Sequence, residues 1–228
     1  MGTLTAATPK PMLLLQGRPI LEHILRGLAG AGVDSVVLVT GYLSEQIEEY
    51  FGTGHRVGLR IVYRRQPRAD GTARALLLAA DLAASGDMLI SWGDVLIEPH
   101  EYIDLVNDFR RSSCDALLSL NWMDDPWRGA AVYVDDDWRV RRLVEKPPRA
   151  SSTTHWNNAG IFVATPLLLS YANQLQRSAR CEYELPQAIA AMIADGRVVR
   201  GHPLGGFWSD LGTPEDLAAA EKGYPQSR

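Results

Sequence analysis

Two aspartates stand where the sequence could hold a metal ion. Asp94 ends the segment Ser91-Trp-Gly-Asp94, directly after the apolar run 87–92, and Asp210 lies in the glycine-rich segment 205–213 after another apolar run. Ligands of open α/β sheets bind beyond the carboxyl ends of the strands. Mg²⁺ takes one or two protein carboxylates and completes its shell with phosphate oxygens and water. The pair therefore predicts a Mg²⁺–triphosphate site; the alternatives are an N-cap at Asp94 and a turn former at Asp210.

Two other segments carry groups suited to binding a phosphorylated substrate. Lys146 stands between a predicted strand end and a proline, where it offers a point charge to a phosphate monoester, and Glu145 beside it can accept hydrogen bonds from sugar hydroxyls. Gln66 and Gly71 lie in a loop between a strand and a helix, where backbone N–H groups can contact an anion or a base edge. The amide of Gln66 can both donate and accept. A solvated charge pair and a simple strand–helix turn are the alternatives.

The elements that must position these residues alternate between helices and strands. Helical spacing of apolar residues predicts helices at 20–31, 42–51, 72–84 and 102–111, and apolar runs predict strands at 35–40, 59–63, 87–92 and 116–121. A β-hairpin (131–134 and 139–145), a strand (158–164), helices (166–173 and 184–194), a strand (198–204) and a helix (214–221) follow. The run Ser35–Thr40 is typical of a strand buried on both faces. This order predicts a layered α/β domain with a largely parallel sheet.

Composition and charge exclude several classes of protein. The 228 residues carry a net charge of −4 and no basic stripe, which argues against a broad nucleic-acid surface. No apolar stretch reaches the roughly 18 residues needed to span a bilayer, and the N-terminal residues do not have the pattern of a signal peptide. Cys114 and Cys181 are far apart and are expected to be buried thiols. We therefore expect a cytoplasmic chain without membrane or nucleic-acid partners.

The order of short motifs along the chain is more specific than any one of them. The motifs are Pro9-Lys10-Pro11-Met12, Gly17–His23, Ala31–Val33, Gln66 with Gly71–Ala73, Gly93-Asp94, Glu145–Pro147, Asn158–Gly160 and Trp208–Thr213. This series resembles the sugar-1-phosphate nucleotidyltransferase family, which includes glucose-1-phosphate thymidylyltransferases and mannose-1-phosphate guanylyltransferases. The resemblance runs from about residue 2 to residue 222, nearly the whole chain.

The resemblance implies a Rossmann-like α/β/α fold with a small β lid for the sugar, in a single domain over 1–228. Its nucleotide-binding part would be 1–122, its lid 123–165, and its C-terminal helices with the second metal-ligand loop 166–228. The implied reaction is attack by a sugar 1-phosphate on the α-phosphorus of a nucleoside triphosphate, with release of pyrophosphate and with Mg²⁺ as cofactor. Such chemistry rests on positioning and charge neutralisation rather than on a protein nucleophile.

The resemblance also assigns roles to residues by position. The implied catalytic residues are Lys10, Asp94 and Asp210, the two aspartates being the Mg²⁺ ligands. The implied nucleotide-binding residues are Gly2, Thr3, Gln66, Gly71 and Thr72. The implied sugar-phosphate-binding residues are Gly129, Glu145, Lys146 and Asn158. The expected partners are a nucleoside triphosphate and a sugar 1-phosphate, and a homo-oligomer is left open.

The sequence departs from the family pattern at its start. The family opens with a buried strand and a loop of the form G-x-G-T-R-x-x-P-L-T, of which only Gly2-Thr3 and Leu4-Thr5 have counterparts here. We therefore expect the loop arginine and the central strand, between 36–40 and 88–92, to be missing. Because such an arginine offsets triphosphate charge, the first alternative is a catalytically impaired regulatory or sugar-nucleotide-binding relative. The second is a cytidylyltransferase for a non-sugar phosphate such as phosphocholine. The motifs identify neither the base nor the sugar.

Overall fold

A computed structural model of the chain describes residues 5–225 and divides them into two compact units. Of the described residues, unit 1 comprises 5–67, 92–104 and 205–225, and unit 2 comprises 68–91 and 105–204. Helix α5 (Pro99–Arg111) begins in the first unit and ends in the second. Within the described residues, no helix is both long and apolar enough to cross a lipid bilayer.

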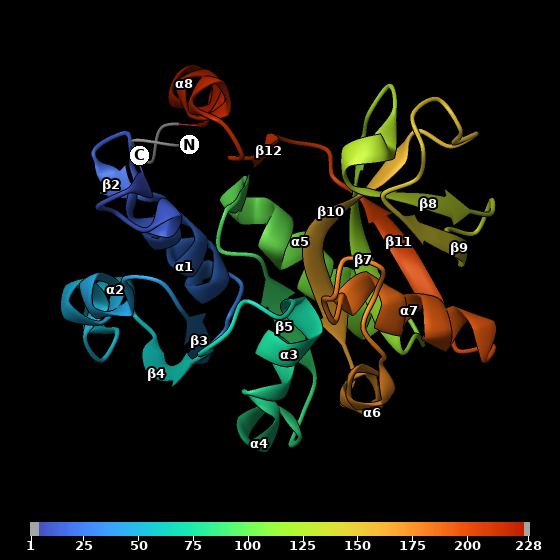
Figure 1. Ribbon diagram of the computed structural model, residues 1–228, viewed down its shortest axis with the longest axis horizontal. Helices are drawn as coiled ribbons and strands as arrows, with labels where there is room; N and C mark the ends of the chain where they lie inside the picture. The colour runs from blue at the N-terminus through green and yellow to red at the C-terminus, as the bar shows by residue number, and fades with distance from the viewer. Residues whose placement is uncertain (1–4, 226–228) are drawn as a thin grey trace. The chain divides into compact units, whose positions relative to one another are not determined.

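Unit 1 contains three small two-stranded sheets with helices around them (Figure 1). Its elements are η2 (Lys10–Met12), β1 (Leu14–Leu15), β2 (Arg18–Pro19), α1 (Ile20–Gly30), β3 (Ser35–Thr40), α2 (Ser44–Phe51), η3 (His55–Val57), β4 (Arg60–Arg65), β6 (Val95–Ile97), β12 (Trp208–Asp210) and α8 (Pro214–Gly223). Strands β3 and β4 are parallel, whereas β1–β2 and β6–β12 are antiparallel. The apolar face of α1, with Ile20, Ile24 and Leu25 at most 2% exposed, supplies much of the core of this unit.

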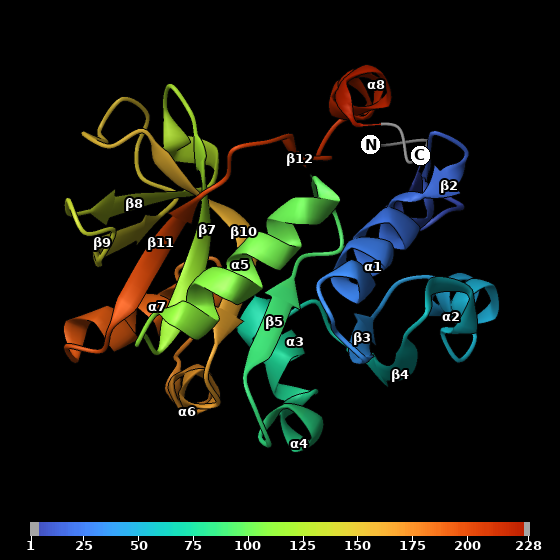
Figure 2. The ribbon, with the colours of Figure 1, turned by 180° about the vertical axis from the view of Figure 1, so that it is seen from behind.

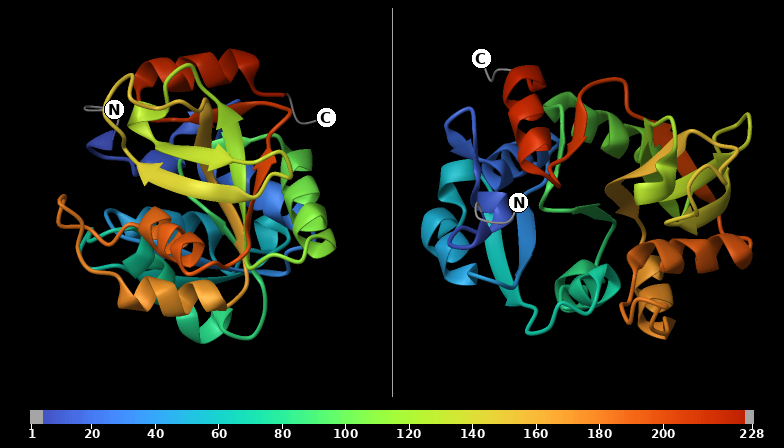
Figure 3. Two further views of the ribbon diagram at one scale, coloured as in Figure 1. Left: turned by 90° about the vertical axis from the view of Figure 1, so that its right-hand side faces the viewer. Right: turned by 45° about the horizontal axis from the view of Figure 1, so that its top comes forward.

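Unit 2 is built on a six-stranded sheet of order β11-β7-β10-β8-β9, with β5 also paired to β10. Its elements are α3 (Thr72–Leu77), α4 (Ala80–Ala83), β5 (Met88–Ser91), β7 (Ala116–Trp122), η4 (Pro126–Arg128), β8 (Ala130–Val134), β9 (Val140–Glu145), β10 (Trp156–Ala164), α6 (Leu167–Gln174), α7 (Leu185–Ala194) and β11 (Val199–Pro203). Strand β11 lies beside β7 (Figure 2), and β8 and β9 form a hairpin (Figure 3). Strands β7 and β10, buried along most of their length, form the centre of the core.

The expectation of a largely parallel sheet is wrong for unit 2. Strand β10 runs antiparallel to β5, β7 and β8, and only the β11–β7 pair is parallel. The physical reason is that an apolar run buried on both faces has the same composition in either direction. Strand direction is set by the connections and the packing, which periodicity does not encode.

Strand β3 is less buried than its β-branched sequence predicts. Ser35 is exposed, Val36–Val39 are half-buried, and only Thr40 is buried. In the described part of the chain β3 pairs with β4 alone, and β5 pairs with β10 alone. An unpaired edge leaves side chains and ladder groups accessible, which is why most of β3 is only half-buried.

Three further details differ from the predictions. The helix predicted at 72–84 is divided into α3 and α4, and neither β6 nor β12 was predicted because each has only three residues. Cys114 is half-buried, and burial raises the pKa of its thiol to about 11. Cys181 is exposed, so the expectation of two buried thiols is wrong for this residue.

Candidate active site

The three predicted catalytic residues, Lys10, Asp94 and Asp210, lie together in unit 1. The Lys10 ammonium donates to Asp94 Oδ2 at 2.7 Å, and its Nζ is 3.6 Å from Asp210 Oδ1. Lys10 begins η2 directly after Pro9, and Pro11 follows it, so the backbone that carries the lysine has little conformational freedom. We call Lys10, Asp94 and Asp210 the carboxylate cluster.

The short β6–β12 sheet brings the two aspartates together. Asp94 immediately precedes β6, and Asp210 ends β12, where it pairs with Val95. A further backbone bond joins Leu211 N to Asp94 O at 3.0 Å. Two carboxylates that are 116 positions apart in the sequence (94 and 210) are therefore held at the same end of one antiparallel pair.

The electrostatics of the carboxylate cluster favour an added cation. Partial burial of the carboxyl group, and then the negative charge of Asp94, raise the pKa of Asp210 above its ordinary value, while Lys10 lowers it. The cluster holds two carboxylates and one ammonium, so it carries an excess negative charge when all three groups are ionised. Carboxylate oxygens are the donors that Mg²⁺ takes in proteins, and these two already approach the same cationic nitrogen. The donor set thus fits the predicted metal.

Two glutamates hold the loop that leads to Asp210. Glu98 directly precedes α5, and Glu101 lies in its first turn. Glu101, which is 2% exposed, accepts hydrogen bonds from Gly205 N at 2.8 Å and Gly206 N at 2.6 Å. Glu98 accepts from Phe207 N at 2.9 Å. These charge-assisted bonds fix the loop before β12.

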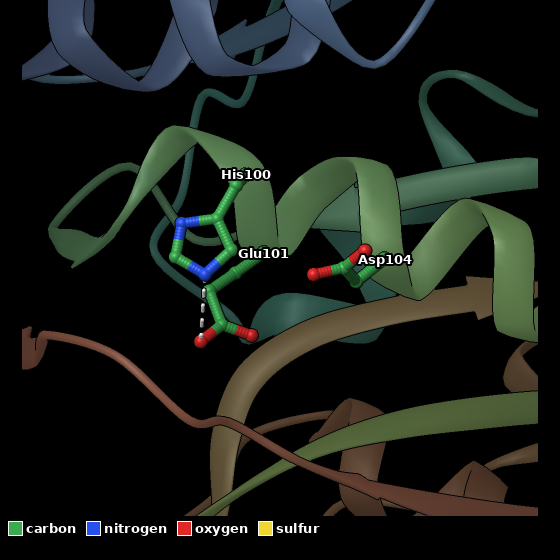
Figure 4. A group of neighbouring side chains, drawn as sticks. All are labelled: His100, Glu101 and Asp104. Carbon is green, nitrogen blue, oxygen red and sulfur yellow. Dashed lines mark ion pairs between the residues drawn. The ribbon is translucent and has the colours of Figure 1, made fainter.

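His100, Glu101 and Asp104 form a second group of potential metal ligands (Figure 4). The Nε2 atom of His100 lies 3.7 Å from Glu101 Oε1, the oxygen that also accepts the two glycine N–H bonds. The group lies in the first turns of α5, where the positive end of the helix dipole opposes a bound cation. We assign Glu101 the structural role of anchoring the loop.

Three of the four predicted sugar-phosphate residues meet at the β8–β9 hairpin of unit 2. Glu145 ends β9 and pairs with Ala130, next to Gly129. Lys146 N donates to Gly129 O at 2.7 Å, and Lys146 has a φ of 44°, a left-handed conformation that lysine rarely adopts. The backbone therefore places an exposed lysine and a half-buried glutamate side by side at the strand end. Held in this way, they offer one positive and one negative group to a ligand.

Glu145 titrates far from the usual range of a carboxyl group. Burial, followed by the charge of Glu184, raises the pKa of Glu145 to about 7, and Lys146 and Arg180 partly oppose this. Glu184 is itself buried and accepts hydrogen bonds from Arg180 at 2.8 Å and from Gln187 at 3.2 Å. A glutamate with this pKa changes its charge near neutral pH.

Asn158, the fourth predicted sugar-phosphate residue, is buried on β10. Its side chain is 3% exposed, and its Oδ1 accepts from Gly160 N at 3.2 Å. Its Nδ2 has no hydrogen-bond partner among the described residues. An unsatisfied buried donor costs roughly 1–3 kcal/mol, so a group that accepts from it on binding would recover that cost.

The predicted nucleotide-binding residues are divided between the units. Gln66 follows β4 in unit 1, and its N donates to Thr40 O at 2.7 Å. Gly71 and Thr72 belong to unit 2. Gly71 has a φ of 117° and an added Cβ would overlap the backbone of Tyr183, while Thr72 Oγ1 accepts from Leu185 N at 2.9 Å. These contacts explain both residues structurally, and their nucleotide-binding role stays a prediction. Gly2 and Thr3 lie outside the described residues.

Two asparagines near the predicted sugar-phosphate residues, Asn121 and Asn157, were not predicted from the sequence. Asn157, directly before Asn158, accepts a hydrogen bond from Ala130 N and donates one to Asn121 Oδ1. Two adjacent asparagines in an otherwise apolar strand were the available signal, because a buried amide is costly unless it is hydrogen-bonded. The hydrogen-bond partners of the Asn157 side chain on β7 and β8, however, are distant from it in the sequence.

Comparison with known proteins decides the family. The model of the nucleotidyl transferase family matches residues 2–227. The chain belongs to the nucleotidyl transferase family. It is 29% identical over 220 residues to the low-salt glycan biosynthesis nucleotidyltransferase Agl11 of Haloferax volcanii, which matches 96% of this chain but 61% of Agl11. The chain thus spans less than two thirds of that relative's length.

Two further likenesses agree with this family. The UTP–glucose-1-phosphate uridylyltransferase AglF of Haloferax volcanii is 30% identical over 223 residues, which cover 96% of this chain and 89% of AglF. The crystal structure of a UDP-glucose pyrophosphorylase complexed with UDP-glucose has a TM-score of 0.89 at 16% identity and covers 98% of this chain and 93% of the other. At this identity the structural likeness shows the fold, which is the predicted α/β nucleotidyltransferase fold.

Proposed function

We propose that the chain is the transferase domain of a sugar-1-phosphate nucleotidyltransferase that depends on Mg²⁺. The observation that carries the proposal is the convergence of Asp94 and Asp210 on the Lys10 ammonium, at 2.7 and 3.6 Å, in a chain of the nucleotidyl transferase family. Two carboxylates that converge on one point suit a hard cation bound to phosphate, and the lysine suits the phosphate itself.

In the proposed reaction an oxygen of the sugar phosphate attacks the α-phosphorus of a nucleoside triphosphate. The bond between the α-phosphorus and the oxygen bridging to the β-phosphorus breaks, and pyrophosphate leaves with that electron pair. Asp94 and Asp210 would hold Mg²⁺, which when bound would supply charge neutralisation of the phosphates. Lys10 adds a positive charge beside the two carboxylates. Transfer to the sugar phosphate therefore needs no protein nucleophile.

The sugar phosphate is assigned to the residues of unit 2. Lys146 would pair with the phosphate as a point charge, and the carboxylate of Glu145 would accept hydrogen bonds from sugar hydroxyls. Asn158 Nδ2, buried without a partner among the described residues, would donate to a hydroxyl. These three groups provide a cation, an acceptor and a donor, which is the set that a phosphorylated sugar needs.

The relatives support this proposal over the two alternatives. AglF is named for UTP and glucose 1-phosphate, and Agl11 for glycan biosynthesis. None of the relatives named above is a regulatory subunit or a cytidylyltransferase for phosphocholine. UTP with glucose 1-phosphate is therefore the first substrate pair to test.

The test is an assay of pyrophosphate release by the purified full chain. UTP, dTTP, GTP, CTP and ATP would each be paired with glucose 1-phosphate, mannose 1-phosphate, N-acetylglucosamine 1-phosphate and phosphocholine, with and without Mg²⁺. We expect pyrophosphate and a nucleotide sugar in equal amounts for at least one sugar pair, abolished by EDTA and restored by excess Mg²⁺. Turnover of phosphocholine alone would establish the second alternative. Binding of UDP-glucose without turnover of any pair would establish the impaired relative.

The cellular context of the proposal can be tested separately. Nucleoside triphosphates and sugar phosphates are cytoplasmic metabolites, so we place the reaction in the cytoplasm, and recovery of the activity in a membrane or secreted fraction would contradict this. Light scattering of the purified chain would show whether it forms a homo-oligomer.

A further inference from the structure

Asn157 is a buried polar residue at the centre of the sheet in unit 2. It lies on β10, is 3% exposed and has apolar neighbours further along the same strand, such as Ile161 and Phe162. A β-branched or aromatic residue would be the ordinary choice at such a position. An amide there needs hydrogen bonds to offset its desolvation.

Each end of the Asn157 amide is satisfied. Its Oδ1 accepts from Ala130 N at 3.0 Å. Its Nδ2 donates to Asn121 Oδ1 at 2.8 Å and to Asn158 O at 2.9 Å. We call Asn121, Asn157 and Asn158 the amide network. Because the two donor bonds fix which end of the amide is the oxygen, Asn157 can accept only toward β8.

The acceptor bond of Asn157 holds the segment that carries the proposed sugar-phosphate residues. An added Cβ on Gly129 would overlap Asn157 Oδ1, so the glycine lies directly against this oxygen. The Gly129 carbonyl in turn accepts from Lys146 N at 2.7 Å, and Ala130 pairs with Glu145. The Asn157 side chain thus fixes the start of β8, to which the backbone of Glu145 and Lys146 is hydrogen-bonded.

The donor bonds of Asn157 reach the other proposed sugar contact. By donating to Asn158 O, Asn157 holds the backbone of the residue whose Nδ2 has no hydrogen-bond partner within the described residues. The bond to Asn121 ties the same amide to β7, and Asn121 and Asn157 are cross-strand partners. The network therefore connects Asn158 to the Gly129–Lys146 pair through neutral groups alone.

We infer that Asn157, oriented by Asn121, is a positioning residue for the sugar phosphate. It touches no reacting atom. It sets the relative placement of Asn158 Nδ2, Glu145 and the Lys146 backbone, and thereby the affinity for the sugar phosphate. The inference rests on the proposed function, and it assigns to unit 2 a role in recognising the sugar that is separable from the carboxylate cluster.

Steady-state kinetics of Asn157→Ala test the inference. With UTP and glucose 1-phosphate, or the pair that the unaltered chain turns over, we expect KM for the sugar phosphate to rise about 10-fold, the effect of roughly 1.4 kcal/mol in affinity. KM for the nucleoside triphosphate should stay within about 2-fold. Asn121→Ala, which leaves the Ala130 bond in place, should raise KM for the sugar phosphate about 3-fold. Asn173→Ala, at an exposed site on α6 of the same unit, is the matched control and should change neither KM.

A second pair of variants separates positioning from general stability. In Gly129→Ala the new methyl group overlaps Asn157 Oδ1, so we expect KM for the sugar phosphate to rise at least 10-fold. In the double variant Gly129→Ala with Asn157→Ala the overlap is removed, and KM should fall back to that of Asn157→Ala. Additive effects, or equal rises in both KM values, would contradict the inference. Circular dichroism and Tm of each variant show whether it folds, and if Asn157→Ala does not, Asn121→Ala carries the test.

The result for the unaltered chain separates the two proposals. If it turns over a sugar phosphate and folded Asn157→Ala keeps the same KM for it, the inference is wrong and the proposed function stands. If it shows no turnover, calorimetry with glucose 1-phosphate replaces the KM measurement. Binding that Asn157→Ala weakens about 10-fold then supports positioning without catalysis, and absence of binding overturns both proposals.

Discussion

The carboxylate cluster of unit 1 and the amide network of unit 2 hold their groups by opposite physical means. In the cluster, Lys10 is paired with Asp94 and Asp210, whose side chains are 37% and 59% exposed. In the network, Asn121, Asn157 and Asn158 are at most 6% exposed and carry no charge. The cluster is accessible to a charged ligand. The network is held by hydrogen bonds between buried groups of the sheet.

This difference indicates how the two regions should respond to change. Interactions between exposed charges weaken with salt and depend on the ion that is bound. A buried network of neutral amides is insensitive to salt, but much of the stabilisation that it provides is lost when one member is removed. Variants of the cluster should therefore affect catalysis and the Mg²⁺ requirement, and variants of the network should affect affinity for the sugar phosphate.

The largest effect is expected from the cluster itself. Asp94→Asn and Asp210→Asn keep the side-chain shape but remove the charge, so kcat should fall about 10²–10³-fold, as for loss of one preorganised transition-state group. The Mg²⁺ concentration for half-maximal rate should rise in both variants. Measured rates across a Mg²⁺ titration check this, with Asp136→Asn, an exposed carboxylate on the β8–β9 turn, as the control. Unchanged Mg²⁺ dependence would remove both aspartates from the metal site.

An intermediate effect is expected at Asn158 of unit 2, whose Nδ2 has no hydrogen-bond partner in the described part of the chain. Asn158→Ala removes the buried Nδ2 donor, and the lost hydrogen bond to a sugar hydroxyl should raise KM for the sugar phosphate about 10-fold. Free Mg²⁺ dependence should stay that of the unaltered chain, in contrast to the aspartate variants. A change in Mg²⁺ dependence without a change in KM would reverse the assignment of the two regions.

A pH dependence should arise in unit 2 through Glu145. Its pKa is raised from 4.5 to about 7, so the folded chain binds this proton more tightly than the unfolded chain. The resulting stabilisation is full below about pH 4.5 and is lost as the pH rises to about 7. In the proposed function, in contrast, the ionised carboxylate is the form that would accept hydrogen bonds from sugar hydroxyls. Affinity for the sugar phosphate should therefore increase between pH 6 and pH 8, roughly a unit either side of that pKa.

Glu145→Gln is the variant that checks this pH dependence. It cannot ionise, so its Tm relative to the unaltered chain should rise as the pH increases from about 5 to about 8. Its affinity for glucose 1-phosphate should change less over that range than that of the unaltered chain, because only the second ionisation of the phosphate, at about pH 6, remains. Glu215→Gln, an exposed glutamate in the first turn of α8, is the control. A parallel pH profile in Glu145→Gln and in the unaltered chain would exclude Glu145 as the titrating group.

The smallest effect is expected at the cap of α8, just after Asp210. Thr213 accepts from Asp216 N at 3.2 Å, and Asp216 accepts from Thr213 N at 2.8 Å, which makes a reciprocal capping box. Thr213→Ala should cost about 1 kcal/mol and lower Tm by roughly 2–4 °C. Calorimetry checks this against Thr153→Ala, an exposed threonine of unit 2. KM for the sugar phosphate should stay unchanged, because the cap belongs to unit 1.

Much of the fold follows from local patterns. The helices near 20–30 and 185–194 and the strands near 35–40 and 116–122 appear close to their predicted positions, because apolar periodicity and turn residues are local properties. Strand direction was predicted wrongly in unit 2. The antiparallel pairing of β10 depends on partners 26 or more positions away, the nearest being Ala131 opposite Asn157, which no local window contains.

The sequence by itself determined which residues are candidates for chemistry. Asp94, Asp210, Glu145 and Lys146 are recognisable because few residue types can bind a metal ion, a phosphate or a sugar, and Lys10 and Asn158 are recognisable from the order of the family's motifs. Only the tertiary structure decided which of these groups lie close together. The three-residue strands β6 and β12 bring Asp94 to Asp210, and Asn157 joins Gly129, Asn121 and Asn158. The physical reason is that hydrogen bonds and charge interactions act over a few ångströms in space, whereas the order of residues specifies only neighbours along the chain.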